Sequence, residues 1–305
     1  MTDAIRGYWT AVPTPLTALG AVDNARLATH VRGLFAAGID GVVLFGTTGE
    51  GTSFNVGERI ATVEALLGAG IAPGRIGLGG GFAAITDSIS LTRAALAAGL
   101  TQILLLPPYF YRDVDAAGIE SAFAAILDAV ADDRLRLTLY HIPQVAGVGV
   151  PPDVAAKLRA RYGHVVAGVK DSSADFDQFR AFRAAAPQLA VTVGNEADIA
   201  RAMAEGGAGT ICGMANVAPA LVKMMLDGPA KDTAKETAKE TAKEIAMREA
   251  IALVSGRPFV PALKAILAAQ TGDSAWAQVR PPLRAVADGA ALKARLDAVL
   301  RSAGL

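Results

Sequence analysis

Short apolar runs alternate with amphipathic stretches along this sequence, and that alternation limits its possible folds more than any other feature. The runs are rich in Val, Ile and Leu and show no polar alternation, as expected for strands of a parallel sheet covered by helices on both faces. Eight runs predict strands at residues 7–12, 41–45, 75–79, 102–106, 136–140, 165–170, 190–193 and 209–212. Helical patterns between them cover residues 24–37, 56–67, 88–98, 117–131, 152–161, 176–186 and 196–205.

Eight such units within about 210 residues predict an α/β fold, a closed (β/α)8 TIM barrel. An open doubly wound sheet is the alternative, but it would be expected to carry a glycine-rich turn directly after the first strand. This chain has Pro13-Thr14-Pro15 there. Three predicted helices end at Gly38, Gly99 and Gly206, as left-handed helix caps require. The barrel is expected in residues 1–216.

Residues 217–305 contain no convincing strand and are expected to form the last barrel helix and a helical extension, within one continuous catalytic unit. Part of this region, residues 231–244, is a tandem repeat of the type Lys-Glu-Thr-Ala. The repeat predicts an exposed helix, because faces of mixed charge are usually solvated.

Composition excludes several classes of function. Lys+Arg and Asp+Glu each number 29, so there is no basic excess for nucleic-acid binding. Cys212 is the only cysteine, and His30, His141 and His164 lack zinc-ligand spacing, so no disulfide, metal or cofactor is expected. The first residues do not resemble a signal peptide, and no apolar stretch is long enough to span a membrane. These features predict a cytoplasmic protein.

In a TIM barrel the chemistry lies at the carboxyl ends of the strands. Hydroxyls, phenols and one amine gather there, whereas carboxylates and histidines are few. The segments that follow the strands are Pro13-Thr14-Pro15, Gly46-Thr47-Thr48-Gly49-Glu50-Gly51, Pro107-Pro108-Tyr109-Phe110-Tyr111, Tyr140-His141-Ile142-Pro143, Lys170-Asp171-Ser172-Ser173, Gly194-Asn195-Glu196 and Gly213-Met214-Ala215-Asn216.

Lys170, which ends the apolar run of residues 165–169, is the candidate nucleophile. A lysine at the end of an arbitrary strand is usually solvated. This chain, however, offers no metal site or histidine base for the chemistry. A neutral lysine amine attacks ketones, and desolvation in an apolar barrel mouth favours the neutral form. The resulting iminium withdraws electrons from the adjacent carbon, which permits aldol cleavage or condensation.

Neighbouring strand ends supply candidate partners for this amine. Residues 46–50 have the glycines, hydroxyls and following helix start of a carboxylate cradle, although an ordinary turn uses glycine in the same way. Tyr140 should project beside Lys170 and relay protons, or it is a tyrosine of the barrel rim. Tyr109 and Tyr111 are further relay or interface candidates, or exposed loop aromatics. His141 should face the opposite side of its strand.

These residues together resemble the dihydrodipicolinate synthase / N-acetylneuraminate lyase family of class I aldolases, over nearly the whole chain. The matching segments occur in order and at similar spacing. They are Gly46-Thr47-Thr48-Gly49-Glu50, Tyr140-x-x-Pro143, Gly168-Val169-Lys170-Asp171, Gly194, Ala215-Asn216-Val217 and Pro261-Ala262-Leu263-Lys264.

The resemblance implies roles for these positions. Lys170 would form the Schiff base, while Thr47 and Thr48, with Gly49, would bind the keto-acid carboxylate. Thr47 would also relay protons to Tyr140, and the backbone of Ile211 would border the pyruvate pocket with Gly194. A second relay tyrosine usually comes from the neighbouring subunit of a tight dimer within a homotetramer. Either Tyr109 or Tyr111 could serve, because Phe110 interrupts the tyrosine pair.

The chain departs from true dihydrodipicolinate synthases at one substrate-binding position. They carry an arginine two residues after the proline of Tyr-x-x-Pro, where it binds the second substrate's carboxylate; here Pro143 is followed by Gln144-Val145. Neuraminate lyases and sugar-acid aldolases also lack this arginine. Asn195 and Glu196 are then candidates for binding hydroxyls of a sugar-acid-like substrate.

The leading interpretation is a pyruvate-dependent lyase that cleaves or forms a 4-hydroxy-2-keto acid, using pyruvate and an aldehyde. A dihydrodipicolinate synthase or a sugar-acid dehydratase is the alternative within the same chemistry. A metal-dependent aldolase is disfavoured because suitable ligands are scarce. A catalytically inactive barrel that acts as a binding protein is disfavoured because Lys170, Tyr140 and Thr47 are all present.

Overall fold

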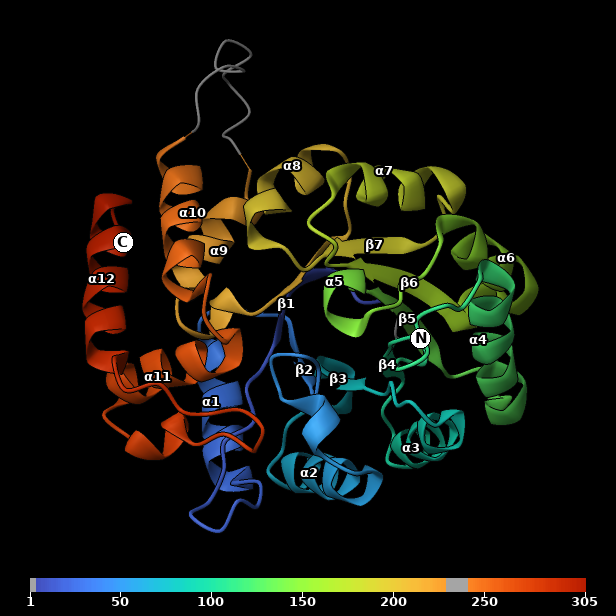
Figure 1. Ribbon diagram of the computed structural model, residues 1–305, viewed down its shortest axis with the longest axis horizontal. Coiled ribbons are helices and arrows are strands. Elements are labelled where there is room, and N and C mark those ends of the chain that lie inside the picture. Colours follow the sequence, from blue (N-terminus) through green and yellow to red (C-terminus); the bar gives the residue numbers. More distant parts are fainter. Residues whose placement is uncertain (1–3, 229–240) are drawn as a thin grey trace.

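The structure, a computed structural model, describes residues 4–228 and 241–305. Eight parallel strands pair in sequence order and close into a barrel, with β8 next to β1 (Figure 1). The predicted TIM barrel is therefore confirmed, and no strand end differs from its prediction by more than one residue. The strands are β1 (Gly7–Ala11), β2 (Gly41–Leu44), β3 (Ile76–Gly79), β4 (Gln102–Leu105), β5 (Arg136–His141), β6 (Val166–Asp171), β7 (Ala190–Val193) and β8 (Gly209–Cys212).

Helices surround the barrel and cover the outer face of every strand. Those between the strands are α1 (Asn24–Ala36), α2 (Val56–Gly68), α3 (Ile85–Ala97), α4 (Ala116–Val130), α6 (Pro152–Tyr162), α7 (Phe176–Ala185) and α8 (Ile199–Ala204). Gly38, Gly99 and Gly206 all have positive φ, at 89°, 90° and 79°, which confirms the predicted helix ends.

Two helical predictions were inaccurate, and one helix was missed. α3 begins three residues before Ser88, whose hydroxyl accepts the backbone N–H of Phe82 instead of capping the helix. The predicted helix at 196–205 starts as a 3-10 turn, Glu196–Asp198, before α8. A short helix, α5 (Pro143–Ala146), was not predicted; proline occupies its first turn and Gly147, with φ 76°, ends it.

The barrel interior is filled unevenly, and this leaves room for a site at one end. Near the amino ends of the strands, the Trp9 ring packs over two glycines. A Cβ atom on Gly41 would lie 2.5 Å from this ring, and one on Gly77 would lie 3.6 Å from it. Smaller inward-facing residues, including Ala11 and Val43, follow toward the carboxyl ends. The bulk is therefore concentrated at the amino end, while the carboxyl end remains open.

The C-terminal region contains helices and connecting loops, and no strand within the described residues. Its helices are α9 (Pro219–Leu226), α10 (Ala242–Val254), α11 (Phe259–Thr271) and α12 (Gly289–Ser302), and they pack together beside α1 (Figure 1). Residues 231–240 of the tandem repeat lie outside the described part, so the predicted repeat helix is untested there. Thr241 caps α10 in a capping box with Glu244.

No single helix in the described ranges is long and apolar enough to cross a membrane; only the pair α10 and α11, bent by 105°, meets the length and composition criteria together.

Candidate active site

Lys170 lies near the carboxyl end of β6, between Tyr140 of β5 and Thr192 of β7 in the strand register. Its side chain is buried, and its Nζ lies 4.3 Å from the centre of the Tyr140 ring. Gly194 provides the space for this side chain, because a Cβ atom there would lie 2.9 Å from Lys170 Cε. Within the described residues Lys170 forms no ion pair. The amine is therefore enclosed near the carboxyl end of β6, with no ion-paired carboxylate among the described residues.

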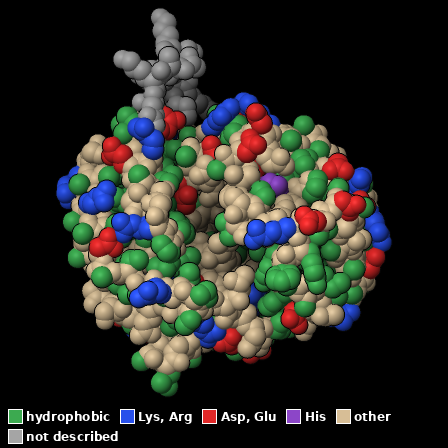
Figure 2. Space-filling model, in the orientation of Figure 1, with side chains coloured by type: hydrophobic (Ala, Val, Ile, Leu, Met, Phe, Trp, Pro, Cys, Tyr) green, Lys and Arg blue, Asp and Glu red, His purple; other side chains and the backbone are tan. Residues whose placement is uncertain are grey.

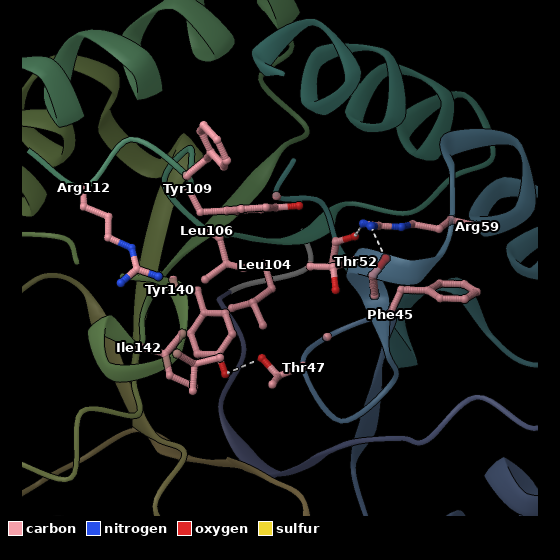
Figure 3. A pocket seen from close by; sticks show the side chains of 17 residues that line it. Phe45, Thr47, Thr52, Arg59, Leu104, Leu106, Tyr109, Arg112, Tyr140 and Ile142 are labelled. Atoms are coloured by element: carbon pink, nitrogen blue, oxygen red, sulfur yellow. Dashed lines mark hydrogen bonds between the residues drawn. The ribbon is translucent and has the colours of Figure 1, made fainter. Parts of the chain in front are cut away.

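Tyr140 connects this lysine to the loop that follows β2. Its hydroxyl lies 3.3 Å from Thr47 Oγ1, within hydrogen-bonding distance, as Figure 3 shows. The strand register brings Tyr140 beside Lys170, while the loop carries Thr47 over the barrel. A hydroxyl pair of this kind passes protons in either direction. The three residues predicted to act together thus form one contiguous group.

The loop at residues 46–51 is a tight coil in which three of the six backbone N–H groups donate to carbonyls of the loop itself. The N–H groups of Gly49, Glu50 and Gly51 donate to carbonyls of Gly46 and Thr47, at 3.0–3.2 Å. Its shape depends on glycine, because a Cβ atom on Gly51 would lie 1.9 Å from a neighbouring carbonyl oxygen.

The carboxylate cradle is consequently smaller than the sequence predicts. The start of α2 is also occupied, by a capping box between Asn55 and Glu58. The groups that Thr47 and Thr48 leave for an anion are their two N–H groups and the Thr48 hydroxyl, because the Thr47 hydroxyl pairs with Tyr140. Thr47 is exposed toward the barrel mouth, whereas Thr48 is buried.

Glu50 faces away from this mouth and ties the loop to the C-terminal helices. Its Oε1 lies 2.6 Å from Lys264 Nζ, and its Oε2 accepts the backbone N–H of Arg280 at 2.9 Å. Lys264 also donates to the Thr14 carbonyl at 2.8 Å, and neither side chain of the ion pair is exposed. Burial lowers the pKa of Lys264, and the nearby Glu50 carboxylate opposes that shift. The C-terminal extension thus anchors the loop that carries Thr47 and Thr48.

A cavity of about 470 Å³ opens at the carboxyl end of the barrel, where Figure 2 shows a hollow in the surface. Tyr140 and Thr47 line it; Lys170 is not among the lining residues, but its Nζ lies 4.3 Å from the centre of the Tyr140 ring. Its wall is largely apolar. The other lining side chains are Phe45, Thr52, Arg59, Leu104, Leu106, Tyr109, Phe110, Arg112, Ile142, Val145 and Ala146.

The three aromatic residues after β4 differ in their exposure. Tyr109 lines the cavity and is partly buried. Phe110 and Tyr111 are 79% and 76% exposed and pack edge to face, with ring centres 5.5 Å apart. Within one chain, Tyr109 is the tyrosine available to the cavity, and Tyr111 projects outward.

The residues predicted after β7 have partners within the chain. Asn195 donates to Asp198 at 2.6 Å, and Glu196 Oε1 accepts the N–H groups of Gly213 and Met214, both at 2.9 Å. Neither Asn195 nor Glu196 lines the cavity. Glu196 therefore holds the end of β8 in place.

Ile211 is buried inside the barrel, in the same cluster of inward-facing residues as Tyr140. His141 packs on the outer side of its strand, as predicted. Its Nδ1 accepts the N–H of Val150 at 3.0 Å, and its ring packs against Phe182. Burial lowers the pKa of His141.

Two arginines at the cavity were not predicted. Arg59 replaces an apolar residue on the inner face of α2, and its guanidinium donates to the carbonyls of Phe54, Gly51 and Gly79. Burial lowers the pKa of Arg59 to about 10. The sequence signal that could have identified Arg59 was a charged residue on the otherwise apolar face of its helix. Arg112 lies in the loop after β4, where no local pattern distinguishes it from a solvated residue.

Comparison with known proteins places this geometry in one family. The model of the dihydrodipicolinate synthetase family matches residues 4–300. An uncharacterized DapA-like lyase from Chloroflexus aurantiacus is 37% identical over 300 residues, covering 97% of each chain. A 4-hydroxy-tetrahydrodipicolinate synthase from Thermomicrobium roseum is 34% identical over 231 residues, covering 73% of this chain and 74% of the relative. The crystal structure of dihydrodipicolinate synthase from Agrobacterium tumefaciens has a TM-score of 0.88 and 32% identity, covering 97% of this chain and 100% of that one. The chain therefore belongs to the dihydrodipicolinate synthetase family of carbon–carbon lyases.

Proposed function

We propose that this protein is a pyruvate-dependent class I aldolase that forms a Schiff base on Lys170 and cleaves or forms a 4-hydroxy-2-keto acid. The observation that carries the proposal is the enclosed Lys170 amine, 4.3 Å from the centre of the Tyr140 ring, with the Tyr140 hydroxyl next to Thr47. Membership in a family of lyases supports it.

In the first half of the reaction, Lys170 Nζ adds to the C2 carbonyl of pyruvate, and the resulting carbinolamine loses water to give an iminium. Tyr140 supplies the proton that leaves with this water and recovers one through Thr47. The N–H groups of Thr47 and Thr48 and the Thr48 hydroxyl bind the pyruvate carboxylate, while the Thr47 hydroxyl pairs with Tyr140.

In the second half, loss of a C3 proton gives an enamine. C3 then attacks the carbonyl carbon of an aldehyde, and the aldehyde oxygen takes up a proton. Water hydrolyses the new iminium, which releases the 4-hydroxy-2-keto acid and regenerates the lysine. Cleavage is the reverse sequence. No step requires a redox change or another reactant, so the residues of the site suffice for the proton transfers.

A homo-oligomer is part of the proposal. Phe110 and Tyr111 expose two aromatic rings beside the cavity mouth, and exposed aromatic groups of this kind are common at protein interfaces. A second copy that covers them would place its own aromatic residues near the site, in a dimer or a tetramer built from dimers.

Hydrogen exchange at C3 of pyruvate tests the chemistry without knowledge of the aldehyde. In D2O the protein should catalyse the replacement of the methyl protons of pyruvate by deuterium. The loss of the methyl proton signal measures this exchange. Lys170→Arg should abolish the exchange. Lys157→Arg is the matched control, because Lys157 forms an exposed ion pair with Asp153, and it should retain the exchange. Exchange in the Lys170→Arg variant at the unaltered rate would contradict the proposal.

A further inference from the structure

The two arginines of the cavity differ in how many of their donors are in use. The Arg59 guanidinium donates to three backbone carbonyls and stacks 4.0 Å from the centre of the Phe82 ring, so its position is fixed by the protein. Arg112 also lines the cavity, but among the described residues it forms neither a hydrogen bond nor an ion pair. Its donors are free for a bound molecule.

Arg112 is an exposed residue, but one side of its side chain lies against the end of α5. Its side chain lies across Gly147, where a Cβ atom would be 2.9 Å from Nε and 3.3 Å from Cζ. Gly147 has φ 76° and ends α5, so glycine both allows the turn and leaves a flat surface for the guanidinium. Figure 3 shows Arg112 extending from its loop toward Tyr140 and Ile142. The free donors therefore face the space above the reaction centre.

The rest of the cavity defines the kind of molecule that these donors would meet. No acidic side chain is among the cavity-lining residues, all of which belong to the described part of the chain. Leu104, Leu106, Ile142 and Val145 provide an apolar wall next to Arg112. An anionic group is favoured here, whereas an ammonium group would find no counter-charge.

The inference rests on the proposed function and concerns its second substrate. We propose that Arg112 binds a carboxylate of the aldehyde partner, whose apolar body lies along Leu104, Leu106 and Ile142. The carboxylate of pyruvate occupies Thr47 and Thr48, so each acidic group has its own binding residues. A guanidinium matches a carboxylate with two parallel hydrogen bonds, which makes Arg112 a specificity-determining residue.

Gln144 and Val145, which follow Pro143, do not offer a free donor to a carboxylate. Val145 is apolar, and the Gln144 side chain donates to the Ser172 carbonyl at 2.6 Å. The substrate class that fits is an aldehyde with an apolar body and a carboxylate, and without an amino group. Hydroxyl groups along the body would face the apolar wall unpaired, which costs binding energy.

The test compares matched aldehydes in the condensation with pyruvate. Two pairs differ in the carboxylate: 4-oxobutanoate with butanal, and 4-formylbenzoate with benzaldehyde. The measured quantity is the ratio of kcat/KM for the acid to kcat/KM for its neutral counterpart. The unaltered enzyme should prefer the acid in at least one pair. Arg112→Gln should lower that ratio by about 10- to 100-fold, the range expected for a hydrogen bond to a charged group.

Two further variants separate the role of Arg112 from general damage. Arg112→Lys should recover part of the ratio, because it keeps the charge but loses the paired donors. Arg134→Gln is the matched control; Arg134 lies before the amino end of β5, where it pairs with Asp132, and its loss should leave the ratio unchanged.

Outcomes for this inference and for the proposed function are distinguishable. An enzyme that exchanges the C3 protons of pyruvate but keeps its ratio in Arg112→Gln would overturn the role of Arg112 alone. A preference of the unaltered enzyme for the neutral aldehyde in both pairs would overturn it as well. Absence of C3 exchange in the unaltered enzyme would instead contradict the proposed function.

Discussion

Lys264→Met should destabilise the protein strongly, although Lys264 lies in α11, outside the barrel. Methionine fills nearly the same volume, so the change removes the charge and leaves little cavity. It breaks the 2.6 Å contact with Glu50 and the 2.8 Å hydrogen bond to the Thr14 carbonyl. The Glu50 carboxylate then remains buried, and within the described part of the chain only the backbone N–H of Arg280 donates to it. Removing one partner of a buried ion pair costs about 3–5 kcal/mol.

A urea titration followed by tryptophan fluorescence measures this loss as a change in the free energy of unfolding. Lys157→Met removes an exposed ion pair instead and should lower the free energy of unfolding far less than Lys264→Met does. The double variant Glu50→Gln/Lys264→Met should be more stable than Lys264→Met, because the unpaired charge is gone. If Lys264→Met costs less than about 1 kcal/mol, or the double variant is the less stable of the two, the ion pair does not anchor the loop as argued.

Three other substitutions test the site and its surroundings. Gly194→Ala places a Cβ atom 2.9 Å from Lys170 Cε and should slow C3 exchange of pyruvate by about 100-fold; an unchanged rate would show that Lys170 does not need this space. Tyr140→Phe and Thr47→Val should each slow the exchange by about 10²- to 10⁴-fold, and together by less than the product, because both serve one proton relay; multiplicative effects would argue for independent roles. Burial lowers the pKa of His141 in the folded protein. Below about pH 6.5 the unfolded chain therefore binds a proton more readily, and the free energy of unfolding decreases as the pH is lowered. His141→Asn should weaken that dependence in urea titrations at pH 7 and pH 5, and an identical dependence would exclude His141 as its source.

The fold could be predicted from the sequence because a buried parallel strand leaves a simple pattern. Each strand is an apolar run between helices, and the order of strands in a barrel follows from the order in the sequence. The same topology brings Tyr140 beside Lys170, since adjacent strands end at adjacent positions on the barrel rim. The helix starts were less certain, because a hydroxyl such as that of Ser88 can cap a helix or satisfy a loop.

The rest of the site depends on contacts that leave no local pattern. Glu50 belongs to a loop that resembles an anion site, yet its carboxylate is held by Lys264, 214 residues further along the chain. The internal hydrogen bonds of the loop, which leave only Thr47 and Thr48 for an anion, likewise follow from its three-dimensional shape. Arg112 can be told from a solvated arginine only in the folded structure, where its side chain lies against Gly147 at the end of α5.

Trapping the Schiff base tests the central claim most directly. The unaltered protein is incubated with pyruvate, reduced with borohydride, digested and mapped by mass spectrometry. The enclosed position of Lys170 predicts a reduced pyruvate adduct on that residue, and no such adduct on the corresponding peptide of Lys170→Arg. An adduct that is absent, or that occurs only on exposed lysines such as Lys157, would contradict the assignment of Lys170 as the nucleophile.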